Sequence, residues 1–379
     1  MKRNDFATFI VYIAMFAVAI CAGLFLIAPT IRNDNNLSTM ESVLFVLLSV
    51  AIGLLLNGVG LELIHILGGK MGHNKIVSVA ILGLIFKKTN GKWKASLGSY
   101  EGLTGQTKYC PEDAEKSTLS AAIVLPMLAY LIEFVVGVIL IIVFSGKAWV
   151  VILIQGILTV GGMIFIYNDF PARIDTETDG YRLVLLNKPI NRIAYNQLLI
   201  AENGVFPDGK RPETPVYDEI TEFTARLNLL TVYRKELAGE YAEAIKILDK
   251  TIQAGKKPSG SAVEEAVAQK LGLLLLGSDS KAARKLYEED MSDEQRKYVA
   301  NLSSLSALRC YILVSAVLDE SETETNYALE RAASMLKKAN EAEKEAETAL
   351  LKASYARAAS LHPGWELFAD YLPAEPEKK

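Results

Sequence analysis

The sequence predicts a mainly α-helical membrane protein, with four transmembrane helices and a β-hairpin insert followed by a soluble α-helical domain. Three observations predict this fold class. Hydrophobic residues make up 51% of the 379 positions, they are concentrated in the N-terminal half, and the C-terminal half is rich in charged residues. The two halves therefore suit different solvents. We expect a membrane domain at 1–200, a linker at 201–216 and a cytosolic domain at 217–379.

Four segments are long and apolar enough to cross a bilayer, for which about 20 apolar residues suffice. Their approximate bounds are 7–30, 40–68, 119–145 and 147–168. The first segment has the basic start of a signal peptide, but its apolar region is longer and no small-residue cleavage site follows it. We therefore interpret the first segment as a retained helix.

Basic residues set the expected orientation in the membrane, because cytoplasmic loops carry an excess of lysine and arginine. Lys2 and Arg3 precede the first span, and eight lysines from Lys70 to Lys116 lie between the second and third spans. The other two loops contain one basic residue each. We expect a multi-pass protein of the cell membrane, with both termini and the 70–117 loop in the cytoplasm.

Segment 75–99, between the second and third spans, predicts the β-hairpin. It is rich in valine and isoleucine and contains Asn90-Gly91, a dipeptide that tolerates positive φ and favours a tight turn. The first strand is apolar on both faces, so we expect it to lie against lipid or helices. The second strand alternates lysine with tryptophan, which suits an interface.

The C-terminal segment predicts paired helices. Gly239 and Gly277 each introduce a similar pattern of small and apolar residues, at an offset close to the tetratricopeptide period of about 34 residues. This segment resembles tetratricopeptide repeats, although the later helices fit the consensus poorly and a generic helical bundle is the alternative. The resemblance implies a concave surface that recruits a cytosolic protein partner.

Composition argues against several classes of function. A net charge of −4 gives no reason to expect a nucleic acid as partner. Cys21, Cys110 and Cys310 have neither the spacing of a metal knuckle nor that of a disulfide framework. The four spans show no inverted repeat and no pair of broken helices, which gives a transporter or permease little support.

Two ionisable residues stand near the cytoplasmic end of the second span, in the stretch NGVGLELIHILGGKMG. Glu62 and His65 are three positions apart and so share one helix face. An unpaired ionisable side chain inside a span costs at least about 2.5 kcal/mol, which makes the two residues a candidate site. The alternative is that they only pair with each other. The zinc-protease motif H-E-x-x-H requires a histidine where this chain has Leu61.

Further motifs follow in a defined order. The helix motif is followed by the predicted hairpin, the stretch EGLTGQTKY, one more span, and a span that ends in Asn-x-x-Pro at Asn168–Pro171. Asp179-Gly180 comes next. In this order and topology, residues 40–190 resemble the site-2 protease family of intramembrane zinc metallopeptidases, and a Gram-positive subgroup of it in particular.

The resemblance implies roles for individual residues. In active members, two histidines and an aspartate bind Zn²⁺, and a glutamate removes a proton from the zinc-bound water. By position, His65 and Asp179 would be metal ligands and Glu62 the general base. Asn168 would position the substrate or the oxyanion. The hairpin would offer a strand edge to an unwound transmembrane or peptide substrate.

Leu61 departs from the family pattern at the first ligand, because an alkyl side chain cannot bind a metal. Two protein ligands remain where catalytic zinc has three. His73 and Cys110 are candidate substitutes, although nothing in the sequence requires either. We expect a catalytically impaired or inactive site-2-protease-like protein that binds a membrane or peptide partner. The alternative is an active zinc-dependent endopeptidase that cleaves transmembrane or signal-peptide-like segments, and Zn²⁺ is expected only if the site is competent.

Overall fold

The chain forms two compact units, Met1–Arg211 and Pro212–Lys379. The computed structural model describes residues 3–34, 37–89, 92–100, 102–174, 177–204, 213–254, 261–277, 279–301, 304–337 and 341–370. The described residues are mostly helical, with one small antiparallel sheet.

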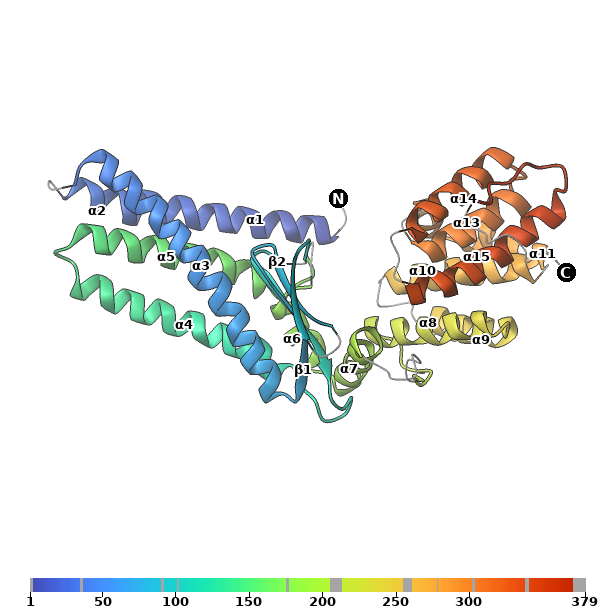
Figure 1. The fold of residues 1–379 in the computed structure, drawn as a ribbon, viewed down its shortest axis with the longest axis horizontal. Coiled ribbons are helices and arrows are strands. Elements are labelled where there is room, and N and C mark those ends of the chain that lie inside the picture. The colour runs from blue at the N-terminus through green and yellow to red at the C-terminus, as the bar shows by residue number, and fades with distance from the viewer. Residues whose placement is uncertain are drawn as a thin grey trace. The chain divides into compact units, whose positions relative to one another are not determined.

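The first unit contains four helical segments that are long and apolar enough to cross a membrane, in agreement with the four predicted spans. Figure 1 shows them side by side. The first segment is continuous from α1 through a π-helical turn into α2. The bounds are α1 Arg3–Ala22, the π-helical turn Gly23–Ile27, α2 Ala28–Arg32, α3 Thr39–Met71, α4 Ser120–Val143 and α5 Ala148–Asn168.

Helix α3 is central to this unit and contacts α4, α5 and the sheet. It begins with a capping box, in which Ser38 and Glu41 satisfy each other's backbone N–H groups. Its last turns approach their neighbours without side chains. A Cβ at Gly68 would meet the backbone of Ala122. A Cβ at Gly69 would meet the ring of Tyr109, and one at Gly72 would meet the carbonyl oxygen of Thr118, in the segment before α4. These contacts fix the end of α3 against the sheet.

The insert between α3 and α4 is a four-stranded antiparallel sheet rather than a single hairpin. The strands are β1 Asn74–Ile81, β2 Leu84–Thr89, β3 Lys92–Leu97 and β4 Gly105–Pro111, in the order β3-β2-β1-β4. The predicted first strand is interrupted by a tight turn at Leu82 and Gly83, which have φ values of 48° and 90°. Positive φ is rare for leucine, so only Gly83 signals a turn there, and an isolated glycine in a strand pattern fits a bulge as well. The predicted turn residues Asn90 and Gly91 lie outside the described residues.

Two short helices complete the first unit. They are α6 Asp179–Leu186, which follows the fourth span, and α7 Pro189–Asn203. Helix α7 packs on β4, and Asn203 Nδ2 donates a hydrogen bond to the carbonyl oxygen of Tyr109. Half of the predicted linker, from 205 to 212, lies outside the described residues.

The second unit consists of helices packed around three clusters of buried apolar side chains. Ten of the thirteen residues of helix α13 are buried, and this helix contacts α10, α14 and α15. The helices are α8 Glu222–Leu237, α9 Tyr241–Ala254, α10 Ser261–Leu276, α11 Ser280–Lys285, a π-helical turn Leu286–Asp290, α12 Asp293–Ala300, α13 Leu305–Val317, α14 Glu322–Leu336 and α15 Glu341–Leu361.

A buried charge cluster crosses the core of the second unit. Arg309 on α13 donates hydrogen bonds to Glu236 of α8, at 3.1 Å, and to Glu347 of α15, at 2.9 Å. All three side chains are buried, and the guanidinium also lies over the ring of Tyr233. Burial raises the pKa of Glu236 above its usual value, against the opposing effect of Arg309. No local pattern in the sequence predicts this cluster.

Candidate functional site

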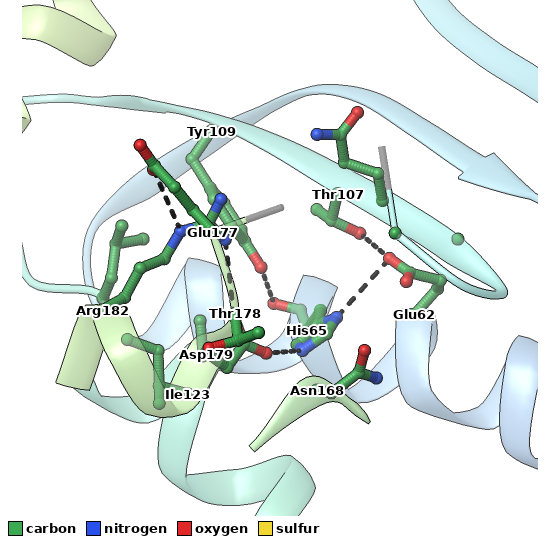
Figure 2. Close-up of a pocket in the computed structure, with 15 residues that line it drawn as sticks. Glu62, His65, Thr107, Tyr109, Ile123, Asn168, Glu177, Thr178, Asp179 and Arg182 are labelled. Atoms are coloured by element: carbon green, nitrogen blue, oxygen red, sulfur yellow. Dashed lines mark hydrogen bonds and ion pairs between the residues drawn. The ribbon is translucent and has the colours of Figure 1, made fainter. Parts of the chain in front are cut away.

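A polar pocket lies where α3, β4, α4, α5 and α6 meet (Figure 2). Its lining includes all four residues to which the sequence analysis gave a role. Glu62 and His65 come from α3, Asn168 from the last position of α5, and Asp179 from the first position of α6. The pocket holds about 640 Å³ of empty space, part of it open to solvent. Segments more than a hundred positions apart therefore build one site.

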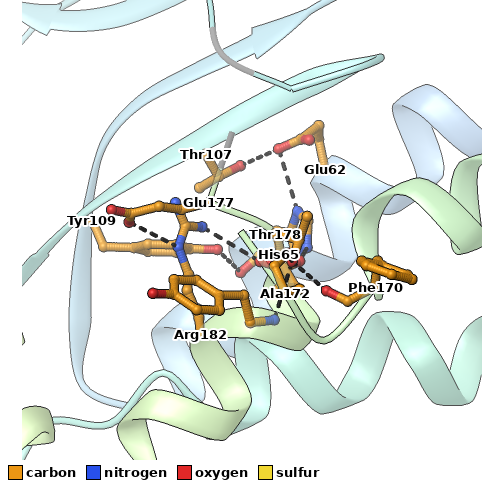
Figure 3. Close-up of polar contacts among 11 residues, drawn as sticks. Glu62, His65, Thr107, Tyr109, Phe170, Ala172, Glu177, Thr178 and Arg182 are labelled. Atoms are coloured by element: carbon orange, nitrogen blue, oxygen red, sulfur yellow. Dashed lines mark hydrogen bonds and ion pairs between the residues drawn. The ribbon is translucent and has the colours of Figure 1, made fainter. Parts of the chain in front are cut away.

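His65 lies between two carboxylates, those of Asp179 (Figure 2) and Glu62 (Figure 3). Its Nε2 is 3.0 Å from Oδ2 of Asp179, and its Nδ1 is 3.5 Å from Oε2 of Glu62. A neutral imidazole donates one hydrogen bond and accepts another, whereas the doubly protonated ring donates two. The arrangement therefore suits an imidazolium held between two negative charges.

Glu62 is almost completely buried, with 1% of its surface exposed. The Thr107 hydroxyl on β4 donates a hydrogen bond of 2.5 Å to the same Oε2 atom that faces His65. Gly105 lies so close that a Cβ there would meet the Glu62 side chain at 2.7 Å. The strand thus fixes the carboxylate in place and shields it from solvent.

Asp179 is positioned by the start of α6. The N-cap residue Thr178 accepts the hydrogen bond from Tyr181 N and donates one of 2.5 Å to the carbonyl oxygen of Phe170. Gly180 packs directly on the backbone of Asp169, so the second residue of the Asp-Gly pair has no room for a side chain. This contact supplies a physical reason for the glycine in that motif.

Arg182 extends the network of polar contacts beyond Asp179. Its Nη1 is 3.4 Å from Oδ1 of Asp179, and its Nε is 3.8 Å from Oε2 of Glu177. Burial by itself would raise the pKa of Asp179, but His65 and Arg182 outweigh that effect and hold the pKa below its usual value. Asp179 is therefore a stable anion between two cationic groups.

Tyr109 joins β4 to the backbone of α3. Its hydroxyl donates a hydrogen bond of 3.2 Å to the carbonyl oxygen of His65. Burial raises the pKa of Tyr109 well above its usual value, so the phenol remains a neutral donor. This bond fixes the turn of α3 that carries the imidazole.

Asp169 follows Asn168 directly after the end of α5. Its buried Oδ2 has no hydrogen-bond partner among the described residues. Burial and the charge of Asp179 raise the pKa of Asp169 from 3.8 to about 7, although His65 opposes the shift. The carboxyl group of Asp169 therefore keeps its proton to a higher pH than a free aspartate does.

The residues present do not fit the zinc ion that the family resemblance implies. His65 and Asp179 contact each other directly. Leu61 is buried against Val160 and Ile164 of α5 and does not line the pocket. No group of three or more His, Cys, Asp or Glu residues in the described ranges is arranged to hold a metal ion.

Neither candidate substitute ligand lies in the pocket. His73 follows the end of α3 with a φ of 58°, and its carbonyl oxygen accepts hydrogen bonds from Glu112 N and Ser117 Oγ. Cys110 neighbours Tyr109 on β4, so its side chain is on the opposite face of the sheet, where it bonds to the Pro111 carbonyl oxygen.

Sequence reasoning missed four residues of the site: Thr107, Tyr109, Glu177 and Arg182. The stretch that contains Thr107 and Tyr109 was recognised as a motif, but its strand was not. Arg182 is three positions after Asp179, which on a helix is the spacing of an ion pair. Comparisons with family models, curated proteins and solved structures give no match.

Proposed function

We propose that this chain is a site-2-protease-like membrane protein that works without a catalytic zinc ion and binds a membrane or peptide partner at the pocket beside His65. The observation that supports this function is the occupation of both imidazole nitrogens by carboxylates. A metal at this site would have to displace Asp179 from His65 and would still have too few ligands. In this proposal Glu62 orients and charges His65 and is not a general base.

The shape of the site supports an extended partner segment. The pocket lies at the ends of α3 and α5, which are long and apolar enough to cross a membrane. Strand β4 borders it and is an edge of the sheet. An unwound segment that leaves the bilayer can add to a strand edge through its backbone and present a side chain to Asn168.

We further propose the orientation that the basic loops predict, with both termini in the cytoplasm. The helical unit is then cytosolic, and its several packed helices offer a surface for a protein partner. One molecule then binds two partners, one at the membrane pocket and one at the helical unit.

Zinc stoichiometry by elemental analysis tests the proposal, with detergent-purified protein beside Leu61→His and Leu61→Gln variants. We expect no zinc in the unaltered chain or in Leu61→Gln, which adds polarity without a ligand. Residues 61 and 65 are about one turn of α3 apart, so a histidine at 61 that turns from α5 toward His65 supplies the third ligand, and we expect about one zinc per chain in Leu61→His. Adding His65→Gln to that variant should remove the metal again.

Near one zinc per chain in the unaltered protein would contradict the proposal. That result would favour the active zinc-dependent endopeptidase and would require a metal ligand other than those at the pocket. Absence of zinc from Leu61→His as well would show that the family roles of His65 and Asp179 do not transfer to this chain.

A further inference from the structure

The strand register divides the sheet into two chemically different faces. Thr107 on β4 is opposite Val79 on β1, and Val79 is opposite Phe86 on β2. These residues share one face, because directly paired residues point to the same side. Thr107 bonds to Glu62 on α3, so this is the face turned toward the long helices.

The same face extends beyond the helices as an exposed apolar surface. In the register, Leu84 is opposite Leu97 and Phe86 is opposite Ala95, while Trp93 is opposite Lys88. Four large side chains on this face are exposed by 37–83%: Leu84, Phe86, Trp93 and Leu97. β1 and β4 contact α3, and every residue of β3 is exposed. We call these four residues the apolar shelf.

The opposite face of the same two strands is basic. Lys87 pairs with Lys94, and Lys92 is on the same side two positions away. The row continues through Ser78 to Lys108 on β4. Residues 74–100 contain five lysines and no acidic residue. Lys88, opposite Trp93, is a lysine on the apolar face. A segment with tryptophan, phenylalanine and leucine on one face and a row of lysines on the other matches the pattern of interfacial membrane elements.

The position of the strands fits such an element. Figure 1 shows β1 and β2 running across the direction of α1 and α5, at one end of these helices. Strands that lie across the spans run along the membrane surface. The apolar shelf, on the face turned toward the helices, then faces the lipid around their ends.

We propose that strands β2 and β3 dock in the headgroup region of an anionic lipid leaflet, with the apolar shelf toward the acyl chains and the lysines at the level of the phosphates. The charge of the segment selects anionic over neutral lipid. This inference rests on the membrane location proposed above and not on the chemistry of the pocket, so zinc analysis and the test below fail independently.

Fluorescence quenching in lipid nanodiscs tests the docking. The chain has three tryptophans, so Trp149→Phe with Trp365→Phe leaves Trp93 as the reporter. Lipids brominated near the headgroup should quench Trp93 strongly in phosphatidylglycerol discs and more weakly in phosphatidylcholine discs. A variant that keeps only Trp365, in the helical unit, should show no quenching in either lipid.

Replacing Lys87 and Lys94 with glutamine should weaken docking in the anionic discs about 30-fold, since each lysine near an anionic surface contributes about one factor of five. Lys337→Gln with Lys352→Gln removes the same charge from the helical unit and should leave Trp93 quenching unchanged. Absence of Trp93 quenching in anionic discs would overturn the proposal and favour a protein strand as the occupant of this surface. Equal quenching in both lipids would overturn the role of the lysines.

Discussion

Each of the two units buries a cation between two carboxylates, and the two clusters differ in kind. In the first unit the cation is His65, between Glu62 and Asp179. In the second it is Arg309, between Glu236 and Glu347.

The difference lies in the cation and in what surrounds it. A guanidinium is always charged and has separate N–H groups for both carboxylates, so Arg309 joins three helices permanently. An imidazole has only two ring nitrogens, one for each carboxylate, and the His65 cluster lines a pocket that is partly open to solvent. The Arg309 cluster thus joins helices in the core of the second unit, whereas the His65 cluster forms part of the candidate site.

The largest expected effect is at the Arg309 cluster. Arg309→Met would leave Glu236 and Glu347 buried without a cation, and breaking a buried pair in this way costs about 3–5 kcal/mol. The free energy of unfolding of the second unit should fall by that amount. Urea titration of the full chain in detergent, with Trp365 as the only tryptophan, measures it.

Arg284→Met is the matched control, because Arg284 also forms an ion pair, with Glu288, at an exposed site. Exposed pairs contribute about 0–1 kcal/mol, so this variant should resemble the unaltered protein. Equal losses from both variants would show that the Arg309 cluster does not support the core.

The second prediction concerns Asp169, which lacks a cation of its own. Its folded pKa, about 7, lies above the usual 3.8, so the folded state holds the proton more tightly. The resulting stabilisation is present below pH 3.8 and is lost as the pH rises to about 7. The first unit should lose roughly 2–4 kcal/mol over this window.

Thermal unfolding between pH 4 and 8, followed through Trp149 in detergent, measures that loss. Asp169→Asn keeps the shape of the side chain and cannot ionise, so its melting temperature should vary less with pH. A pH profile that Asp169→Asn leaves unchanged would assign the titration to another group.

The smallest expected effect is at the hydrogen bond that fixes Glu62. Thr107→Val keeps the shape of the residue and removes the donor, which costs about 1.5 kcal/mol for a bond to a charged group. The same Trp149 measurement reports this change. Thr159→Val, which removes a hydroxyl bonded to the Gln155 carbonyl oxygen within α5, is the control and should cost less.

Much of the fold could be predicted because the signals are local or cumulative. Long apolar segments predict the four helices, since hydropathy summed over about 20 residues overrides single positions. The order of the motifs led to Glu62, His65, Asn168 and Asp179, which the structure places around one pocket. Each of those residues is in a recognisable local pattern.

The remainder depends on contacts that no local pattern encodes. The turn at Leu82 and Gly83 holds a leucine at positive φ, so two strands looked like one. Arg309 meets partners 73 and 38 positions away, on helices whose packing the sequence does not specify. The burial of Leu61 against α5 is likewise visible only in three dimensions.

The glycines at the end of α3 have a consequence for engineering this chain. Gly68 and Gly72 place backbone against backbone, and Gly69 places it against the Tyr109 ring. The frame of the pocket therefore cannot be retuned by exchanging side chains at these positions, because any side chain would separate α3 from its neighbours. New specificity has to be designed into the residues that project into the space, such as Ile123 and Asn168, on a frame that stays constant.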